Sequence, residues 1–270
     1  MGGADVVVEE HDEGRVLRLV INRPHRGNAL DEATIEELIS ALSDAEGRES
    51  VRVVVIRGCN HIFSGGADVT AMLDMSPLDF RDYGLAIVRL YESITRLEKP
   101  VIAAVNGAAY GAGNAIVMAC DLRVAAANAT FGQQEILLGL FGGTALLPRH
   151  LKSPARAAEL IMTGAVLSAE EALHLGLVSR VVAPERLDEE VSALCHTLQA
   201  QSAEALKLAK AALRLDAQIS DGSKALESQI NLVSLAFATE ERRARMEAFL
   251  SRRGTRTVKR QGQSPVQPEV

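Results

Sequence analysis

The sequence predicts an α/β fold, because segments typical of buried strands alternate with segments typical of amphipathic helices. Three short β-branched runs, Val16–Ile21, Val51–Ile56 and Val101–Val105, are typical of strands buried on both faces. Apolar residues at helical spacing separate them, over Asp31–Glu46 and Ser76–Leu97. Strands that are joined through helices imply parallel pairing with crossover connections.

Capping signals define the helices in order along the chain. The first helix ends at Gly47, and the second precedes Lys99-Pro100. Ser153-Pro154 predicts the start of a later helix that ends at Gly164. The capping box Ser168-Ala-Glu-Glu171 starts the next one, which ends at Gly176.

From Pro184 onward the strand signals vanish, and we expect three helical segments near 184–200, 202–216 and 222–252. Part of this region, with Val233, Leu235, Ala236 and Phe237, is apolar on more than one face. Two interpretations stay open. These residues belong to an ordinary core, or they are buried against another subunit.

The predicted domain organisation has three parts. Residues 1–195 form the core, residues 196–253 form a C-terminal helical oligomerisation region, and residues 254–270 form a disordered tail. The tail is predicted from its composition, which is rich first in Arg and Lys and then in Gln and Pro.

Composition excludes several classes of partner. The 270 residues carry a net charge of −6, so we expect neither nucleic acid nor an anionic membrane surface as a partner. The sequence has no run of eighteen apolar residues, so we expect no membrane span, and the first residues lack a signal-peptide pattern. Three widely separated cysteines favour a reducing compartment, and the histidines show no metal-ligand spacing. We therefore expect a cytoplasmic location and no metal.

Two glycine-rich turns are candidate binding elements. Phe63–Val69 follows a predicted strand, and its paired glycines allow a turn that aims an amide outward, most plausibly that of Ala67. The alternative is a tight connection that needs no ligand. Asn106–Gly113 leads into an apolar helix over Asn114–Cys120, whose N-terminus favours an anion. Two amides from separate turns that converge on one oxygen would form an oxyanion hole.

Several ordered motifs resemble the enoyl-CoA hydratase/isomerase (crotonase) family, over about residues 5–253. They are Asn22-Arg-Pro24, Asn28-Ala-Leu30, Gly65-Gly-Ala-Asp68, Lys99–Gly107, Gly111-Ala-Gly113, Cys120-Asp121, Phe131-Gly-Gln-Gln-Glu135, Thr163-Gly164, Ala169–Ala172, Gly176-Leu-Val178 and Phe237–Arg242. The resemblance implies a crotonase-like spiral of ββα units with a C-terminal helical trimerisation region, assembled as a homotrimer or hexamer. It also implies an acyl-CoA thioester substrate and no separate cofactor, since coenzyme A is part of the substrate.

The same resemblance implies roles for individual residues. The amides of Ala67 and Ala112 would hold the thioester oxygen, and Glu135 would be the acid/base. The residues implied to bind substrate or coenzyme A are His25, Arg26, Ala29, Gly65, Gly66, Asp68, Val69, Thr70 and Gly111. Arg252 or Arg253 would reach a phosphate of coenzyme A.

The sequence departs from the family pattern at one carboxylate. Hydratases of this family have two glutamates, and the position of the first holds Ala115. Isomerases of the family use one carboxylate, a role that suits Glu135, and burial among Ile136, Leu137 and Leu138 would raise its pKa. The alternative for Glu135 is an ordinary surface or capping carboxylate.

Other positions near the expected pocket also differ or stay open. The segment Gly139–Thr144 is about three residues shorter than the family pattern. A replacement acid would come from the helix that often covers the pocket, with four candidates: Asp74, Asp79, Asp82 and Tyr83. Tyr110 and Asn114 are polar candidates that we expect to be structural.

The sequence therefore predicts an acyl-CoA enzyme, a lyase or an isomerase, that stabilises a thioester enolate with a single glutamate. Isomerisation or hydration of an enoyl-CoA is the leading hypothesis. The alternatives are decarboxylation, dehalogenation or C–C hydrolysis of an acyl-CoA on the same fold, or binding of acyl-CoA without catalysis, which the alanine at position 115 motivates.

Overall fold

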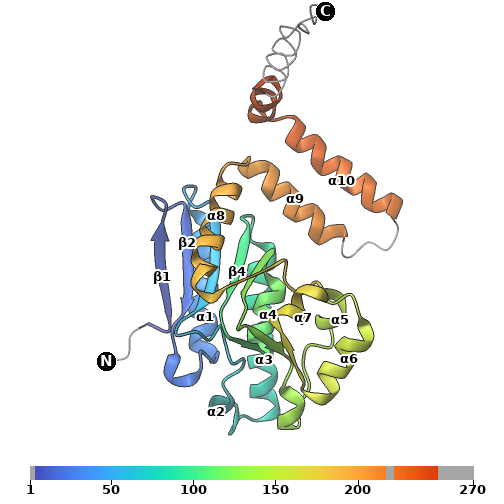
Figure 1. Ribbon diagram of the computed structural model, residues 1–270. Coiled ribbons are helices and arrows are strands. Elements are labelled where there is room, and N and C mark those ends of the chain that lie inside the picture. Colours follow the sequence, from blue (N-terminus) through green and yellow to red (C-terminus); the bar gives the residue numbers. More distant parts are fainter. Residues whose placement is uncertain (1–3, 217–221, 249–270) are drawn as a thin grey trace, which may run out of the picture. The chain divides into compact units, whose positions relative to one another are not determined.

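The computed structural model describes residues 4–216 and 222–248. The chain divides into two compact units, Met1–Ala203 and Glu204–Val270, which are described separately below. Figure 1 labels their elements along the chain.

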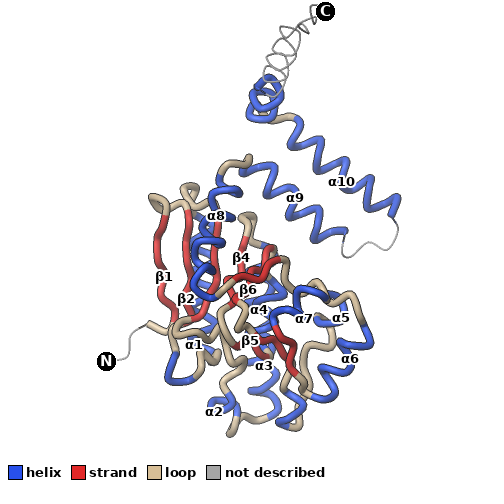
Figure 2. The backbone as a smooth tube through the Cα atoms, viewed as in Figure 1, coloured by secondary structure: helices blue, strands red, loops and turns tan. Residues whose placement is uncertain are grey.

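The first unit is built on a six-stranded sheet (Figure 2). Its strands lie in the order β1 (Val6–His11), β2 (Val16–Ile21), β3 (Val53–Gly58), β4 (Val101–Val105), β6 (Leu122–Ala126) and β9 (Arg180–Val182). Only β1 runs antiparallel to its neighbour, and the remaining pairs are parallel. The predicted parallel pairing of the three β-branched runs is confirmed.

A second, smaller sheet contains β5 (Ala108–Tyr110), β7 (Thr130–Gly132) and β8 (Val166–Ser168) in that order. Two isolated bridges, Leu30 with Ala67 and Ser64 with Ala109, add backbone pairing beside these strands. The chain thus places one strand in the large sheet and then a short extended segment in the second layer, before it enters a helix. This repeat is consistent with a spiral of ββα units.

Helices connect the strands as the sequence predicts. The described helices of this unit are α1 (Glu32–Gly47), α2 (Val69–Met72), α3 (Pro77–Arg96), α4 (Ala112–Ala119), α5 (Leu147–His150), α6 (Pro154–Thr163), α7 (Ala169–His174) and α8 (Leu187–Gln199), with 3₁₀ turns η1 (Pro24–Arg26), η2 (Glu135–Leu138) and η3 (Pro184–Arg186). Ser76 and Asp79 form a complete capping box at α3, and Gly164 ends α6 in the left-handed conformation. Ser168 caps α7, but Glu171 instead pairs with Arg156, at 2.8 Å.

Both faces of the large sheet are buried, as β-branched strands predict. In β3, Val54 and Ile56 belong to the larger core with α1 and α3, whereas Val53 and Val55 belong to a second core. Helix α8 covers the second face through four buried residues: Leu187, Val191, Leu194 and Cys195.

Three strands of the large sheet, β1, β6 and β9, were not predicted from the sequence, and the start of a fourth was misplaced. Strand β9 has only three residues, too few to give a pattern. Strand β1 is polar over half its length, and β6 is short and contains Arg123, so neither shows a continuous apolar run. Strand β3 begins at Val53 and not at Val51, because the amide of Val51 closes a turn onto the carbonyl of Arg48 at 3.0 Å.

The second unit is helical over its described residues. Helix α9 (Ala203–Asp216) leads into it, and α10 (Gly222–Phe237) is followed by a helical stretch over 240–248. The side chains of Val233, Leu235 and Phe237 are exposed, and their burial against another subunit stays a prediction. The predicted tail 254–270 and the candidates Arg252 and Arg253 lie outside the described residues.

Candidate active site

A cavity of about 250 Å³ lies in the first unit where the two glycine-rich turns meet η2. Its lining residues are Gly65, Gly66, Ala67, Val69, Met72, Tyr110, Gly111, Ala112, Gln134, Glu135, Leu137, Leu138 and Leu140. Both residues predicted to supply oxyanion amides and the predicted acid/base are in this set. Four of the residues implied to bind substrate, Gly65, Gly66, Val69 and Gly111, are there as well.

Glycines allow the two turns to approach each other. Gly66 has a φ of +101°, and a Cβ atom there would lie 2.7 Å from the carbonyl oxygen of Tyr110. A Cβ atom on Gly113 would lie 2.7 Å from the carbonyl oxygen of Ser64. Any side chain at either position would therefore force the turns apart. The amide of Tyr110 also donates to the carbonyl of Ser64 at 2.9 Å, which fixes the contact.

The amides of Ala67 and Ala112 are available to a ligand. No described residue accepts a hydrogen bond from either of them. Ala112 is the first residue of α4, so its amide has no acceptor within the helix and lies at the positive end of the helix dipole. Two unpaired amides at one cavity can stabilise a negatively charged oxygen.

The Glu135 carboxylate is packed against backbone. A Cβ atom on Gly142 would lie 2.3 Å from its Oε1, and one on Gly111 would lie 3.2 Å from the same atom. Burial raises the pKa of Glu135 above its ordinary value, as predicted. The expected cause was partly wrong, since Ile136, Leu137 and Leu138 are 38%, 65% and 55% exposed. Close packing by glycine backbone accounts better for the desolvation.

The segment 139–144 packs against the predicted acid/base and the residue two positions before it. Gly142 lies beside the carboxylate of Glu135, and Gly143, with a φ of +70°, lies against the side chain of Gln133. The sequence did not single out Gln133, which is 1% exposed. Gln133 directly follows β7, but Gln134 leaves the extended conformation and Glu135 starts η2, so strand alternation could not have placed Gln133 beside Glu135.

The other residues implied to bind coenzyme A lie outside the cavity lining. Arg26 donates from Nη1 to Thr70 Oγ1 at 3.2 Å, which joins η1 to α2. His25 is exposed on the same turn, and Ala29 is buried. Contact of these residues, and of Asp68, with coenzyme A stays a prediction.

Asp68 has a structural function that the sequence did not indicate. It caps α2, accepting from the amide of Thr70 at 3.0 Å, and pairs with Arg23 at 3.0 Å. Arg23 is 8% exposed and also contacts Asp31 at 2.7 Å and Asp5 at 3.4 Å. This buried arginine therefore joins the N-terminal segment, the start of α1 and the turn that carries Ala67.

None of the four candidate replacement acids lines the cavity. Asp79 completes the capping box of α3, and Asp74 is exposed. Tyr83 is buried, its hydroxyl donates to the carbonyl of Leu30 and accepts from the amide of Asp68, and burial raises its pKa to about 12. Asp82 lies 3.5 Å from Arg81 and faces a different cavity.

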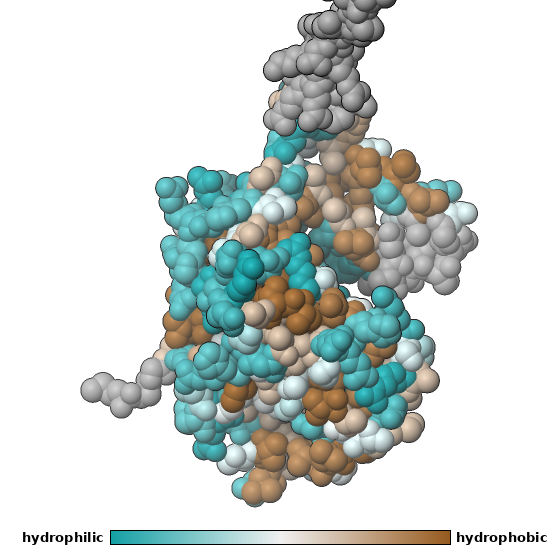
Figure 3. Space-filling view, in the orientation of Figure 1, coloured by the Kyte–Doolittle hydropathy of each residue, from teal (hydrophilic) through white to brown (hydrophobic). Residues whose placement is uncertain are grey.

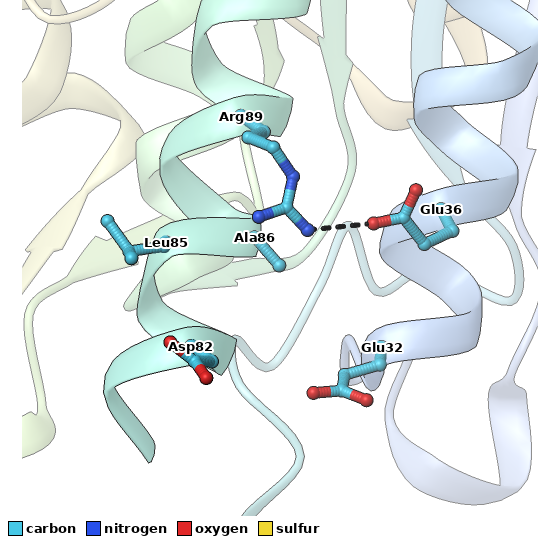
Figure 4. Close-up of a pocket in the computed structure, with 6 residues that line it drawn as sticks. All are labelled: Glu32, Glu36, Asp82, Leu85, Ala86 and Arg89. Carbon is cyan, nitrogen blue, oxygen red and sulfur yellow. Dashed lines mark hydrogen bonds and ion pairs between the residues drawn. The ribbon is translucent and has the colours of Figure 1, made fainter. Parts of the chain in front are cut away.

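That second cavity, of about 240 Å³, lies between α1 and α3 (Figure 4). Glu32 and Glu36 face Asp82 and Arg89 across it, and Arg89 pairs with Glu36 at 3.0 Å. Both members of this pair are more than half exposed. Solvated, paired charges are typical of a surface groove, so we assign no chemistry to it.

Apolar side chains form part of the lining of the first cavity, among them Val69, Leu137 and Leu138. Val69, Leu73 and Leu78, from α2 and the start of α3, are exposed, as are the apolar residues of η2. Figure 3 shows hydrophobic surface at the end of this unit where α2 lies. Exposed apolar surface beside a cavity with a few polar groups is typical of a small-molecule site.

The described residues contain no group of three or more His, Cys, Asp or Glu side chains placed to hold a metal ion. Over the same residues, no helix has the length and apolar character that crossing a membrane requires.

Comparisons with known proteins agree with this geometry. The sequence model for enoyl-CoA hydratase/isomerase matches residues 11–257. A crotonyl-CoA hydratase of Syntrophomonas wolfei is 37% identical over 94% of this chain and 97% of its own length. A short-chain-enoyl-CoA hydratase of Clostridium acetobutylicum is 36% identical over 92% and 95%. The crystal structure of an enoyl-CoA hydratase from Bacillus anthracis superposes with a TM-score of 0.87 at 31% identity, over 92% of this chain and 96% of that one.

The chain therefore belongs to the enoyl-CoA hydratase/isomerase family and has the crotonase fold. It is accordingly an enzyme of the hydratase/isomerase class, as the motifs predicted.

Proposed function

We propose that the chain transfers protons on an enoyl-CoA thioester, with Glu135 as the single acid/base and the amides of Ala67 and Ala112 as the oxyanion hole. One observation carries the proposal. The Glu135 carboxylate and two unpaired amides line the same cavity, while the position of a second glutamate holds Ala115.

The chemistry follows from charge development in the substrate. When a proton leaves the carbon next to the thioester, or a nucleophile adds to the β-carbon, negative charge moves onto the thioester oxygen. Two amide donors at that oxygen stabilise the enolate, and the loss of one such donor typically costs about 10²–10³-fold in rate. The raised pKa of Glu135 suits a group that both takes and returns a proton near neutral pH.

Both leading reactions need only one carboxylate. In isomerisation, Glu135 removes a proton from one carbon and returns it two carbons away through a dienolate. In hydration, Glu135 takes a proton from water while the oxygen of that water bonds to the β-carbon, and then delivers the proton to the α-carbon. In each case the carboxylate is regenerated. The relatives named as crotonyl-CoA and short-chain-enoyl-CoA hydratases support an enoyl-CoA substrate.

Other parts of the proposal concern binding and assembly. Arg26 and Thr70 are joined by a hydrogen bond at the edge of the segment that carries Ala67, which supports their predicted position along coenzyme A. No separate cofactor is needed, because coenzyme A arrives with the substrate. Assembly as a trimer or hexamer and a cytoplasmic location belong to the same proposal.

The test is a panel of 2-enoyl, 3-enoyl and malonyl-type CoA thioesters incubated with the protein in heavy water, with product masses as the readout. A mass gain for D₂O addition identifies hydration, and deuterium incorporation without that gain identifies isomerisation. Release of carbon dioxide from malonyl-type thioesters would instead support decarboxylation. Binding of the thioesters without deuterium exchange would mean that the protein only binds acyl-CoA.

A further inference from the structure

Two buried amide side chains lie behind the Glu135 carboxylate. Asn114, in the first turn of α4, and Gln133, directly after β7, are each 1% exposed. Buried amides are normally hydrogen-bonded, so the pair needs an explanation beyond packing.

Gln133 connects the other two residues when its amide nitrogen faces the carboxylate. Its Nε2 then donates to Glu135 Oε1 at 3.0 Å and lies 3.3 Å from Oε2. Its Oε1 accepts from Asn114 Nδ2, also at 3.3 Å. The remaining polar atom, Asn114 Oδ1, is buried and has no hydrogen-bond partner.

We propose that Asn114 is a positioning residue, which acts through Gln133 to hold the Glu135 carboxyl group in both of its protonation states. The proposal rests on the function proposed above, because only a carboxyl group that takes and returns a proton needs support in both states. Asn114 stands beside Ala115, where the second carboxylate is missing.

The unpaired oxygen of Asn114 makes the network reversible. With Glu135 ionised, the hydrogen bonds run from Asn114 to Gln133 to the carboxylate. When Glu135 holds the proton, its O–H becomes a donor and needs an acceptor. Half-turns of both amides present Gln133 Oε1 to that O–H and Asn114 Oδ1 to Gln133 Nε2. No atom other than the transferred proton has to enter or leave the network.

Other ionisable groups around Glu135 are few or already paired. Tyr110 is the only other titratable side chain among the cavity-lining residues, and its hydroxyl pairs with Thr130 Oγ1 at 2.9 Å. Helix α6, which packs against η2, carries Arg156 and Glu159, paired with each other at 2.9 Å. Besides the backbone of Glu135 itself, which also lowers the pKa of the carboxyl group, Gln133 is the polar group in contact with the carboxylate, and Asn114 reaches it through Gln133.

The direction of the effect follows from hydrogen-bond strength. A bond to a charged acceptor is roughly twice as strong as one between neutral groups. The amide pair therefore favours the ionised form and counteracts burial, which raises the pKa of Glu135. Removal of either amide is expected to raise that pKa further.

The test is a titration of the full-length protein by ¹³C NMR with labelled glutamate carboxyl groups, in which Glu135→Gln assigns the Glu135 signal. Gln133→Met keeps the side-chain length without hydrogen bonding, and we expect the Glu135 pKa to rise by about one pH unit. Asn114→Leu should raise it by a smaller amount. In the double variant, Asn114→Leu should add nothing, because it acts only through Gln133.

Control variants separate an effect on the hydrogen-bond network of Asn114, Gln133 and Glu135 from other effects of substitution. Asn128→Ala removes an exposed amide whose Nδ2 bonds to Asn106, and it should leave the titration unchanged. Asn114→Ala replaces Asn114→Leu if the larger side chain unfolds the protein. An unchanged pKa in both Asn114 variants, or additive shifts in the double variant, would overturn the proposal. The titration uses no substrate. If the variants shift the Glu135 pKa as expected but the protein turns over no thioester, the proposed function is contradicted and the role of Asn114 is not.

Discussion

Replacement of Gly142 by alanine is expected to disable the site with little effect on folding. The new methyl carbon would lie 2.3 Å from Glu135 Oε1 and 2.7 Å from its Cδ. Ordinary contact distances require the carboxylate to retreat by roughly 1 Å. A misplacement of about 1 Å in a reacting group can cost on the order of 10²-fold, so we expect a loss of that size in kcat/KM.

The assay is initial turnover of the best thioester from the substrate panel, together with thermal unfolding of each variant. Gly142 has no left-handed backbone, and the three atoms nearest to an added Cβ atom all belong to the side chain of Glu135. Gly47→Ala is the matched control, since its Cβ atom would meet nothing within 4 Å. If Gly142→Ala turns over substrate as fast as the control, the Glu135 carboxylate does not react from the position that it occupies beside Gly142.

Three further predictions concern charge. Arg23→Met removes the cation that faces three carboxylates, including the buried Asp68, and should lower the free energy of unfolding by about 3–5 kcal/mol in denaturant titrations at fixed protein concentration. Arg15→Met, which removes an exposed ion pair, is the control. If Arg23→Met loses no more free energy of unfolding than Arg15→Met, the stabilising role of Arg23 is contradicted. The acid limb of the kcat/KM profile should lie above pH 4.5, because burial raises the pKa of Glu135 and only its carboxylate accepts a proton. For the same reason, the contribution of Glu135 to stability should be greatest below pH 4.5 and be lost as pH rises through its folded pKa. An acid limb of the kcat/KM profile at or below pH 4.5 would contradict both the kinetic and the stability prediction.

The fold was predictable where burial leaves a continuous pattern. Strands β2 and β4 match the expected bounds because both faces of the sheet are covered, so every position except Arg18 is apolar. Strand β1 pairs at the edge of the sheet and alternates only partly, so its sequence resembles a polar segment. Helix starts were accurate where a side chain caps them, as Asp31 does for α1 at 2.9 Å.

The site was predictable as far as its motifs are local. The two glycine turns and Glu135 were found because each motif has its own spacing in the sequence. Asn114 was named only as a structural candidate. Gln133 and the buried Arg23 were not found, because their contacts depend on side-chain orientation or on partners that are distant in sequence. Arg23 and Asp68 are 45 positions apart in the sequence, so no local pattern predicts their ion pair.

The central claim is that Glu135 alone moves the protons of the reaction. The most direct measurement is exchange of the α-proton of a bound enoyl- or acyl-CoA with heavy water, compared between the natural protein and Glu135→Gln. Glutamate and glutamine side chains are nearly equal in size, so the variant should still bind the thioester. We expect exchange and turnover to fall at least about 10²-fold in the variant. Exchange at the natural rate in Glu135→Gln would contradict the account and point to another base.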